Sequence, residues 1–425
     1  MVNWIESLVN VDRINMDALP RLTADQTAER LGVKLETLYA YVARGRLSRE
    51  RTADGSTFDP LEVERFAASR QRRPGAAARS EGSPLMVIET GFALIDDGEL
   101  SYRGRPVDEL ATEPFETVAH WALTGEWDPE ARLAPAADLE PARAAGAALP
   151  AAAGDRDRQL VAVTALAAAD PLRASLDPSV VATAGERLVA GMVEVLPLRS
   201  PGAGPGTDAA SLASRGSLAE RLFARLAPTP PDDADLALLN AAVVLLLDHD
   251  IAVSTLAARA AASARATPYG VVVAGLGALD SPLHGNASRA AHRLLARVAA
   301  GEDPARVVSD SVLTTHGPVP GFGQPLYPAG DPRARILLRM LAESGRHAEV
   351  VDAVDSVAGV MRDRTGAHPN VDLALGAVTL ACGMADDAGE VVFATARTVG
   401  WLVHALDEYG RAPLRLRPVG RYTGP

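Results

Sequence analysis

Residues 235–250 read DLALLNAAVVLLLDHD, an apolar stretch that ends abruptly on three polar residues. Its leucines, alanines and valines recur at spacings of three and four, which predicts a buried helix over 235–247. The same pattern recurs at 161–169, 180–196, 218–226, 254–264 and 287–299. Strand-like alternation is scarce and is clearest in a predicted hairpin over 85–102, which turns around 96–98. The sequence therefore predicts an all-α body that carries one short hairpin.

Composition limits the class of protein. The chain has 425 residues and a formal charge of −12, and 48% of its residues are hydrophobic, as in globular proteins. This length predicts about two to three domains. The single cysteine, Cys382, excludes an intrachain disulfide and favours a reducing compartment. No apolar run approaches the ~18 residues of a membrane helix and no export leader is evident, so we expect a cytoplasmic protein without membrane contact.

Charge is unevenly distributed along the chain. Residues 20–79 carry twelve basic and eight acidic side chains, a net charge of +4, whereas the remaining residues sum to −16. Residues 73–84 are rich in Gly, Pro, Ala, Ser and Arg and are predicted to form a linker. The sequence thus predicts a small basic head at 1–72, separated by this linker from an acidic body that begins at residue 85.

The head contains a pattern of short helices. Thr23 is placed to cap a first helix, Gly32 supplies a turn, and 35–42 form a second helix. A small β wing at 51–58 and a third helix at 60–70 are predicted to follow. Two short helices around a glycine turn with a basic flank resemble the helix-turn-helix modules of MerR-like and excisionase-like proteins.

This resemblance implies DNA as a partner of the head. Its DNA contacts would come from Thr37, Tyr39, Arg44 and Arg46. The alternative is a helical module that binds protein and not DNA, because a net charge of +4 gives only a modest attraction to phosphates.

Three polar stretches of the body have the residue types of acid–base chemistry. Asp248-His249-Asp250 follows the apolar helix, His284 lies in a loop that opens the helix at 287, and Asp372 ends a turn at 369–372. Loop histidines and aspartates are suited to proton transfer. Taken singly, a histidine beside Pro or Gly is more often a structural hydrogen-bonding group.

The order of these stretches resembles the citrate synthase family across 85–425. The shared pieces are IDDGELSYRG at 95–104, WALTGE at 121–126, DHD at 248–250, PLHG at 282–285, PGFGQ at 320–324, DPR at 331–333, PNVD at 369–372, ARTVGW at 396–401 and RP at 417–418. The resemblance implies a large helical domain from 85–283 and 378–425, and a small one from 284–377.

The resemblance also implies a reaction. The family joins the methyl carbon of acetyl-CoA to the ketone of oxaloacetate and then hydrolyses the thioester. A methyl group beside a thioester is a weak acid, so a carboxylate base and a hydrogen-bond donor at the carbonyl oxygen are needed. By resemblance, Asp372 is this base and His284 this donor. The coenzyme A thioester is then a substrate, and neither a metal nor a prosthetic group is implied.

Carboxylates of a keto acid favour planar, bidentate arginine partners. By resemblance these are Arg333, Arg397 and Arg417, with His249 and Phe393 as further substrate contacts. Arg417 would come from a neighbouring subunit, which implies a homodimer. Without the resemblance, Arg397 would be an ordinary helix-surface residue and Arg417 a contact of the tail.

One catalytic position departs from the family. Gln324 stands where the family has a histidine that donates to the ketone, and Ser281 and Asn286 replace glycines on either side of His284. A neutral amide still donates a hydrogen bond but supplies no proton near pH 7. Three interpretations stay open: a slow citrate synthase, an enzyme for another acyl-CoA and keto acid, or a non-catalytic ligand sensor whose head binds DNA.

Overall fold

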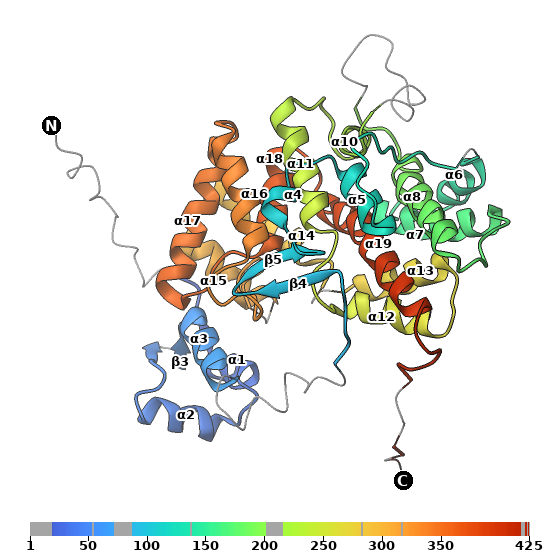
Figure 1. The fold of residues 1–425 in the computed structure, drawn as a ribbon. Helices are drawn as coiled ribbons and strands as arrows, with labels where there is room; N and C mark the ends of the chain where they lie inside the picture. Colours follow the sequence, from blue (N-terminus) through green and yellow to red (C-terminus); the bar gives the residue numbers. More distant parts are fainter. Residues whose placement is uncertain are drawn as a thin grey trace. The chain divides into compact units, whose positions relative to one another are not determined.

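The computed structural model describes residues 19–52, 55–71, 87–136, 138–200, 216–281, 284–315, 318–417, 421–422 and 424 (Figure 1). The chain forms two compact units. Unit 1 takes the described residues within 1–85, 296–319 and 352–367, and unit 2 takes those within 86–295, 320–351 and 368–425. The predicted linker at 73–84 lies outside the described residues. The predicted large and small domains have other boundaries than these units and stay predictions.

Unit 1 includes the head as a three-stranded antiparallel sheet with three helices. The strands β1 (Leu22–Thr23), β2 (Glu50–Thr52) and β3 (Gly55–Phe58) have the order β1-β3-β2. The helices are α1 (Ala24–Arg30), α2 (Leu35–Ala43) and α3 (Pro60–Gln71). The predicted second and third helices are confirmed, and the predicted wing is present as β2 and β3 on either side of residues 53–54, which are not described.

Local chemistry explains the start and turn of the first two helices. The Thr23 Oγ1 accepts from the Gln26 backbone N–H (3.3 Å), and the Gln26 Oε1 accepts from the Thr23 N–H (2.9 Å). This reciprocal pair satisfies two N–H groups that α1 leaves free at its first turn. Gly32 has a φ of 60°, a left-handed conformation that glycine adopts without strain. The predicted cap and the predicted glycine turn are therefore both present.

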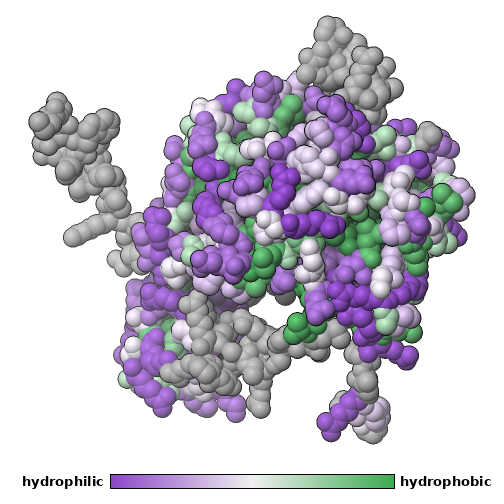
Figure 2. All heavy atoms as spheres, viewed as in Figure 1, coloured by the Kyte–Doolittle hydropathy of each residue, from purple (hydrophilic) through white to green (hydrophobic). Residues whose placement is uncertain are grey.

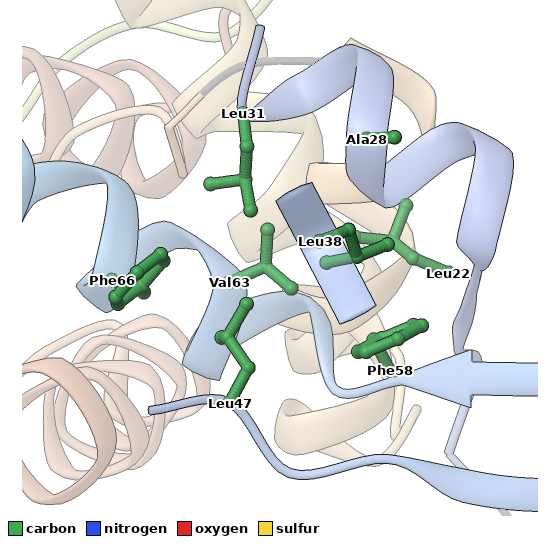
Figure 3. Close-up of a cluster of buried hydrophobic side chains, with 8 residues drawn as sticks. All are labelled: Leu22, Ala28, Leu31, Leu38, Leu47, Phe58, Val63 and Phe66. Carbon is green, nitrogen blue, oxygen red and sulfur yellow. The ribbon is translucent and has the colours of Figure 1, made fainter. Parts of the chain in front are cut away.

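The head has its own apolar core (Figure 3). Its buried members are Leu22, Ala28, Leu31, Leu38, Leu47, Phe58, Val63 and Phe66. Leu313 from α15 (Pro304–Thr315) packs against this cluster, and Arg364 near the end of α17 (Ala348–Thr365) forms an ion pair with Asp59. The head therefore packs on segments that lie far downstream in the sequence.

Unit 2 is mostly helical. Its helices are α4 (Val107–Leu110), α5 (Phe115–Thr124), α6 (Glu140–Ala147), α7 (Asp155–Ala169), α8 (Pro178–Glu194), α10 (Leu218–Leu226), α11 (Asp233–Leu245), α12 (Val253–Ser263), α13 (Pro268–Leu279), α16 (Pro332–Glu343), α18 (Val371–Ala381) and α19 (Ala388–Tyr409), while α14 (Ala287–Ala299) and α17 have residues in both units. All six predicted helical stretches of the body are confirmed. The helix predicted over 235–247 ends earlier, at Leu245. Figure 2 shows hydrophilic side chains over most of the visible face of the molecule.

The predicted hairpin is confirmed. Strands β4 (Ala93–Asp96) and β5 (Glu99–Tyr102) pair in antiparallel register, and β6 (Arg105–Pro106) completes a small sheet. Asp97 and Gly98 both have positive φ, as a two-residue turn of this twist requires. The Tyr102 hydroxyl lies within hydrogen-bond distance of the Leu245 and Asp248 carbonyls (3.1 and 3.0 Å), so the hairpin holds the chain where α11 ends.

Most residues of the long helix α19 are buried. Its Trp401 is fully buried and packs on α13, where a Cβ added to Gly275 would lie 2.5 Å from the indole ring. Glycine at this position lets the two helices approach closely. No helix in the described ranges combines the length and apolar character that crossing a bilayer requires.

We predict opposite effects for two glycine substitutions in α13. Gly275→Ala should lower stability by about 1–3 kcal/mol because the new methyl group overpacks against Trp401. Gly277→Ala is the matched control, because nothing lies within 4 Å of its added Cβ and alanine favours the helix by about 1 kcal/mol. Thermal unfolding should show a lower Tm for the first variant and an equal or higher Tm for the second. A Tm for Gly275→Ala at or above that of the wild type would contradict this packing.

Candidate active site

One face of α19 holds the segment that follows α11. The Arg397 Nε donates to the Leu246 carbonyl (2.9 Å), and the His404 Nε2 lies 3.0 Å from the Asp248 Oδ2. Between them, a Cβ on Gly400 would lie 2.2 Å from the Leu247 carbonyl oxygen. Positions 397, 400 and 404 share one helix face because they are three and four residues apart. This face fixes the backbone that presents His249.

His249 is a buried imidazole with a free nitrogen. It is 8% exposed, its ring centre lies 5.3 Å from that of Tyr327, and its Nε2 has no hydrogen-bond partner among the described residues. Burial, then the charges of Arg333 and Arg397, lower the pKa of His249 well below its usual value. The side chain is therefore neutral near pH 7 and able to bond a ligand.

Two guanidinium groups are buried in the same cluster. Arg333 is 2% exposed and Arg397 is 1% exposed. Asp331 binds Arg333 through two hydrogen bonds, from Nε (3.0 Å) and Nη2 (2.7 Å). Arg397 lies 4.8 Å over the Phe393 ring, and its Nη1 has no partner in the described part of the chain. A buried donor without a partner is costly, so this arrangement favours an anionic guest.

His284 is held by a short hydrogen-bond chain. Its Nε2 lies 2.8 Å from the Ser254 Oγ, which also accepts from the Trp401 Nε1 (3.3 Å). When Ser254 donates to Nε2, the ring proton resides on Nδ1, which is then a hydrogen-bond donor. Burial and the charge of Arg397 lower the pKa of His284 to about 4, so the ring is neutral near pH 7.

The loop around His284 is tightly constrained. A Cβ on Gly285 would lie 2.2 Å from the Leu279 carbonyl oxygen, so only glycine fits there. The His284 ring meets the Phe393 ring edge-on, with centres 5.7 Å apart. Asn286 places a buried Oδ1 without a partner, among the described residues, directly after this glycine.

Asp372 lies in the first turn of α18. The Asn370 side chain caps this helix and accepts from the Asp372 backbone N–H (3.0 Å). The carboxylate of Asp372 forms no hydrogen bond or ion pair with any residue that the structure describes. Burial raises the pKa of Asp372 to about 6, although Arg333 and Arg397 oppose the shift. An unpaired carboxylate with this pKa is a stronger base than an ordinary aspartate.

The loop with Gln324 is joined to the loop that precedes Asp372. The Gly323 N–H donates to the His368 carbonyl (2.9 Å), and the Asn370 Nδ2 donates to the Gly323 carbonyl (3.0 Å). The Gln324 carbonyl accepts from the Tyr327 N–H (3.0 Å), and the Tyr327 ring lies beside His249. These contacts join Gln324 through its loop to the same cluster.

The structure brings most of the predicted body residues together. Ring contacts and shared electrostatics connect His249, His284, Arg333, Asp372, Phe393 and Arg397 within unit 2. Arg417 is exposed, and its backbone N–H donates to the Leu414 carbonyl (3.1 Å). The described part of the chain shows no contact between Arg417 and the cluster, and its role across subunits stays a prediction.

The predicted DNA contacts lie on the surface of the head. Thr37, Tyr39, Arg44 and Arg46 are all exposed. The Arg46 guanidinium lies 5.2 Å from the centre of the Phe66 ring, so this residue also packs on the head itself.

Three residues of the cluster had no role assigned from the sequence. Tyr327 lies between two recognised motifs, Asp331 lies inside one, and Ser254 opens the helix after Asp248-His249-Asp250. Proximity to these motifs was the available signal. Their function as neighbours of His249, Arg333 and His284 depends on contacts between distant segments, which no local pattern encodes.

Sequence comparison identifies relatives of this chain. The family model "Citrate synthase, C-terminal domain" matches residues 81–419. The citrate synthase of Saccharolobus solfataricus is 31% identical over 214 residues, which cover 48% of this chain and 56% of that protein. The 2-methylcitrate synthase 2 of Corynebacterium glutamicum is 29% identical over 230 residues, which cover 52% and 59%. The chain thus spans little more than half the length of these curated relatives.

Solved structures show the same fold. Citrate synthase from Thermoplasma acidophilum, in a ternary complex with carboxymethyl coenzyme A and oxaloacetate, gives a TM-score of 0.65 at 24% identity and covers 81% of this chain and 96% of that chain. The enzyme from Pyrobaculum aerophilum gives 0.64 at 22% identity and covers 89% and 95%. At these identities the likeness shows the fold alone, and it confirms the predicted citrate synthase fold. Since the family model also matches most of its length, the chain belongs to the citrate synthase family.

Proposed function

We propose that this chain condenses an acyl-CoA with a keto acid, with acetyl-CoA and oxaloacetate as the first pair to test. The observation that carries the proposal is the Asp372 carboxylate, which has no partner among the described residues and a raised pKa, in a cluster with two buried arginines. A base and an anion-binding group are the two things that this reaction needs. Relatives named citrate synthase and 2-methylcitrate synthase support the same class of substrates.

Enolisation and condensation can each be assigned to a side chain. Asp372 removes a proton from the methyl carbon, while the His284 N–H donates a hydrogen bond to the thioester carbonyl oxygen as the enolate forms. The enolate carbon attacks the ketone carbon, a carbon–carbon bond forms and the carbonyl π bond breaks. The resulting alkoxide, to which Gln324 donates a hydrogen bond, takes a proton from water, and Asp372 releases its proton to solvent. Water then attacks the thioester, the carbon–sulfur bond breaks, and the thiol leaves with a proton.

Charge complementarity assigns the keto acid to the arginine side of the cluster. Arg333 and Arg397 would bind its carboxylates, and the free Nε2 of His249 would bond its polar oxygens. We propose that Arg417 of a neighbouring subunit completes this set in a homodimer. Gln324 would donate a hydrogen bond without transferring a proton, which favours a slower reaction or an altered acceptor.

Replacing the base should abolish turnover. We expect Asp372→Asn to reduce thiol release from acetyl-CoA with oxaloacetate by about 10²–10⁴-fold, since an amide cannot accept the methyl proton. Asp108→Asn is the control, because Asp108 is an exposed aspartate at the start of α4. Equal rates for Asp372→Asn and the control would refute Asp372 as the base.

Restoring histidine at Gln324 tests the departure. Gln324→His should raise the rate with oxaloacetate by up to about 10²–10³-fold if a missing donor limits the reaction. A rise with other acyl-CoA and keto acid pairs, and none with oxaloacetate, would instead indicate a redirected enzyme. No turnover with any pair, together with tight keto acid binding, would refute the enzyme and support a sensor.

The pH dependence should show one acidic limb. Asp372 acts only when ionised, so log kcat/KM should fall with unit slope as the pH drops below about 6, the pKa to which burial raises this group. His284 adds no limb between pH 5 and 8, because its pKa is lowered to about 4 and its ring stays neutral there. Steady-state rates across pH 5–9 give the profile. A flat profile down to pH 5 would contradict the assignment of Asp372.

We also propose a DNA-binding role for the head, as the second candidate function. The observation that favours it is the exposed side of α2 and its flank, where Thr37, Tyr39 and Arg44 are exposed. Arg49 and Arg51 extend the exposed basic surface toward β2. A short helix preceded by a glycine turn and bordered by arginines suits the major groove of duplex DNA.

Salt dependence would test this role. We expect the full chain to shift its own promoter DNA at low salt, with affinity falling steeply as salt rises because phosphate contacts release counterions. Arg44→Ala should weaken binding and reduce the salt slope by about one. Arg339→Ala, an exposed arginine of α16, is the control. Arg46 is not substituted in this test. Because it packs on Phe66, its replacement would also disturb the packing of the head. Absence of any shift at low salt would exclude DNA.

A further inference from the structure

A buried chain of polar side chains connects the candidate site to the C-terminal segment. In order, its members are Asp248, His404, Arg259, Glu408 and Arg415. The first four are at most 1% exposed. The His404 Nε2 lies 3.0 Å from the Asp248 Oδ2, and its Nδ1 lies 2.9 Å from the Arg259 Nη1. Hydrogen bonds of this length in a buried setting restrict every member.

The direction of each bond follows from the chemistry of arginine. A guanidinium group only donates, so the Nδ1 of His404 accepts from Arg259. The proton of a neutral His404 must then reside on Nε2, where it is donated to the Asp248 carboxylate. Arg259 therefore sets the tautomer of His404, and the tautomer provides the hydrogen bond that holds Asp248.

The other end of the chain reaches the tail. The Arg259 Nη2 donates to the Glu408 Oε2 (2.9 Å) and the Asp407 Oδ2 (2.6 Å). Arg415 forms a bidentate ion pair with Glu408, with both hydrogen bonds at 2.6 Å. One residue earlier, the Leu414 N–H donates to the Ser263 carbonyl (2.7 Å). These bonds seat residues 411–417, which include Arg417.

We propose that His404 is a positioning residue for keto acid binding. It holds Asp248 by the hydrogen bond from Nε2, and Asp248 is the residue directly before His249. Asp250, directly after His249, has a positive φ of 52°, a left-handed conformation that few non-glycine residues adopt. The orientation of the His249 imidazole therefore depends on the neighbouring Asp248, which His404 holds. This inference rests on the proposed function.

The hydrogen-bond chain also makes keto acid binding depend on the position of residues 411–417. Loss of the Arg415 pair leaves Glu408 with Arg259 as its remaining buried partner among the described side chains. If Arg259 shifts toward Glu408, its hydrogen bond to His404 weakens. The hydrogen bond by which His404 holds Asp248 then weakens as well. The position of residues 411–417 and the orientation of the His249 side chain would then change together.

Two substitutions at one position separate positioning from general stability. His404→Asn places its amide near the former Nδ1, so it can still bond Arg259 but no longer reaches Asp248. His404→Gln places its amide near the former Nε2 and can still donate to Asp248. We expect the asparagine variant to raise the KM for oxaloacetate about 10–100-fold, the cost of a hydrogen bond to a charged group. The KM for acetyl-CoA should stay within about twofold, and the glutamine variant should restore much of the oxaloacetate affinity.

The matched control is His292→Asn. His292 is another buried histidine of unit 2, but its Nδ1 bonds Thr379 and it lies outside this hydrogen-bond chain. A merely structural role for His404 predicts that both asparagine variants lower the Tm and leave the ratio of the two KM values unchanged. That result, or equal KM values for oxaloacetate in His404→Asn and the wild type, would overturn the proposal.

A double-mutant cycle tests transmission from the tail. Arg415 is 25% exposed and tolerates Arg415→Gln better than the buried members tolerate change. If the hydrogen-bond chain couples Arg415 to His404, Arg415→Gln should raise the oxaloacetate KM of the wild type. In the His404→Asn background, the fold-increase in KM that Arg415→Gln causes should be smaller by a factor of at least about three. Strictly additive effects would mean that Arg415 does not act through His404, which overturns the coupling.

Calorimetric titration with oxaloacetate separates the two levels of inference. If the wild type and His404→Asn bind oxaloacetate equally well, the positioning role is overturned and the proposed function still stands. A wild type that binds no keto acid and releases no thiol would refute the proposed function, and the positioning role with it.

Discussion

The close contact between α19 and the chain at 246–248 is the constraint on which the site depends. The Arg397 side chain, the Gly400 backbone and the His404 side chain meet this segment on a single helix face. The Arg397 and His404 contacts pair a backbone carbonyl and a carboxylate oxygen in the interior, and the missing side chain at Gly400 lets the two backbones approach closely. Trp401, the next residue along the helix from Gly400, bonds Ser254 and so supports His284. One helix therefore orients both histidines of the cluster.

The electrostatics of the cluster favour an anionic guest. Arg333 has a carboxylate partner in Asp331, whereas Arg397 donates to the carbonyl of Leu246 and has a buried Nη1 with no partner in the described ranges of the chain. Buried ionised groups persist only when other interactions offset their desolvation. A bound dianionic guest would supply that compensation for the two guanidinium groups that lie beside a neutral His249.

The sequence predicted the elements better than their contacts. Helix positions, the hairpin at Asp97-Gly98 and the cap at Thr23 follow from local chemistry, and each is present. The predicted helix end at Leu247 was wrong. Apolar residues continue to Leu247, but α11 ends at Leu245, whose carbonyl accepts a hydrogen bond from the Tyr102 hydroxyl. The site residues came from ordered motifs, not from periodicity. Tyr327 and the packing of Leu313 on the head join segments far apart in sequence, and no local pattern encodes such pairs.

The state of Asp372 distinguishes an enzyme from a sensor built on the same fold. A pocket that only binds a keto acid would need Arg333, Arg397 and His249, and a nearby unpaired carboxylate would repel the anion. Burial raises the pKa of Asp372 and disfavours its ionised form, which is a cost to stability near pH 7. A carboxylate that takes up a proton during a reaction makes use of this raised pKa. Asp372 and the proposed donor His284 therefore favour the proposed condensation over the sensor, even with an amide at Gln324.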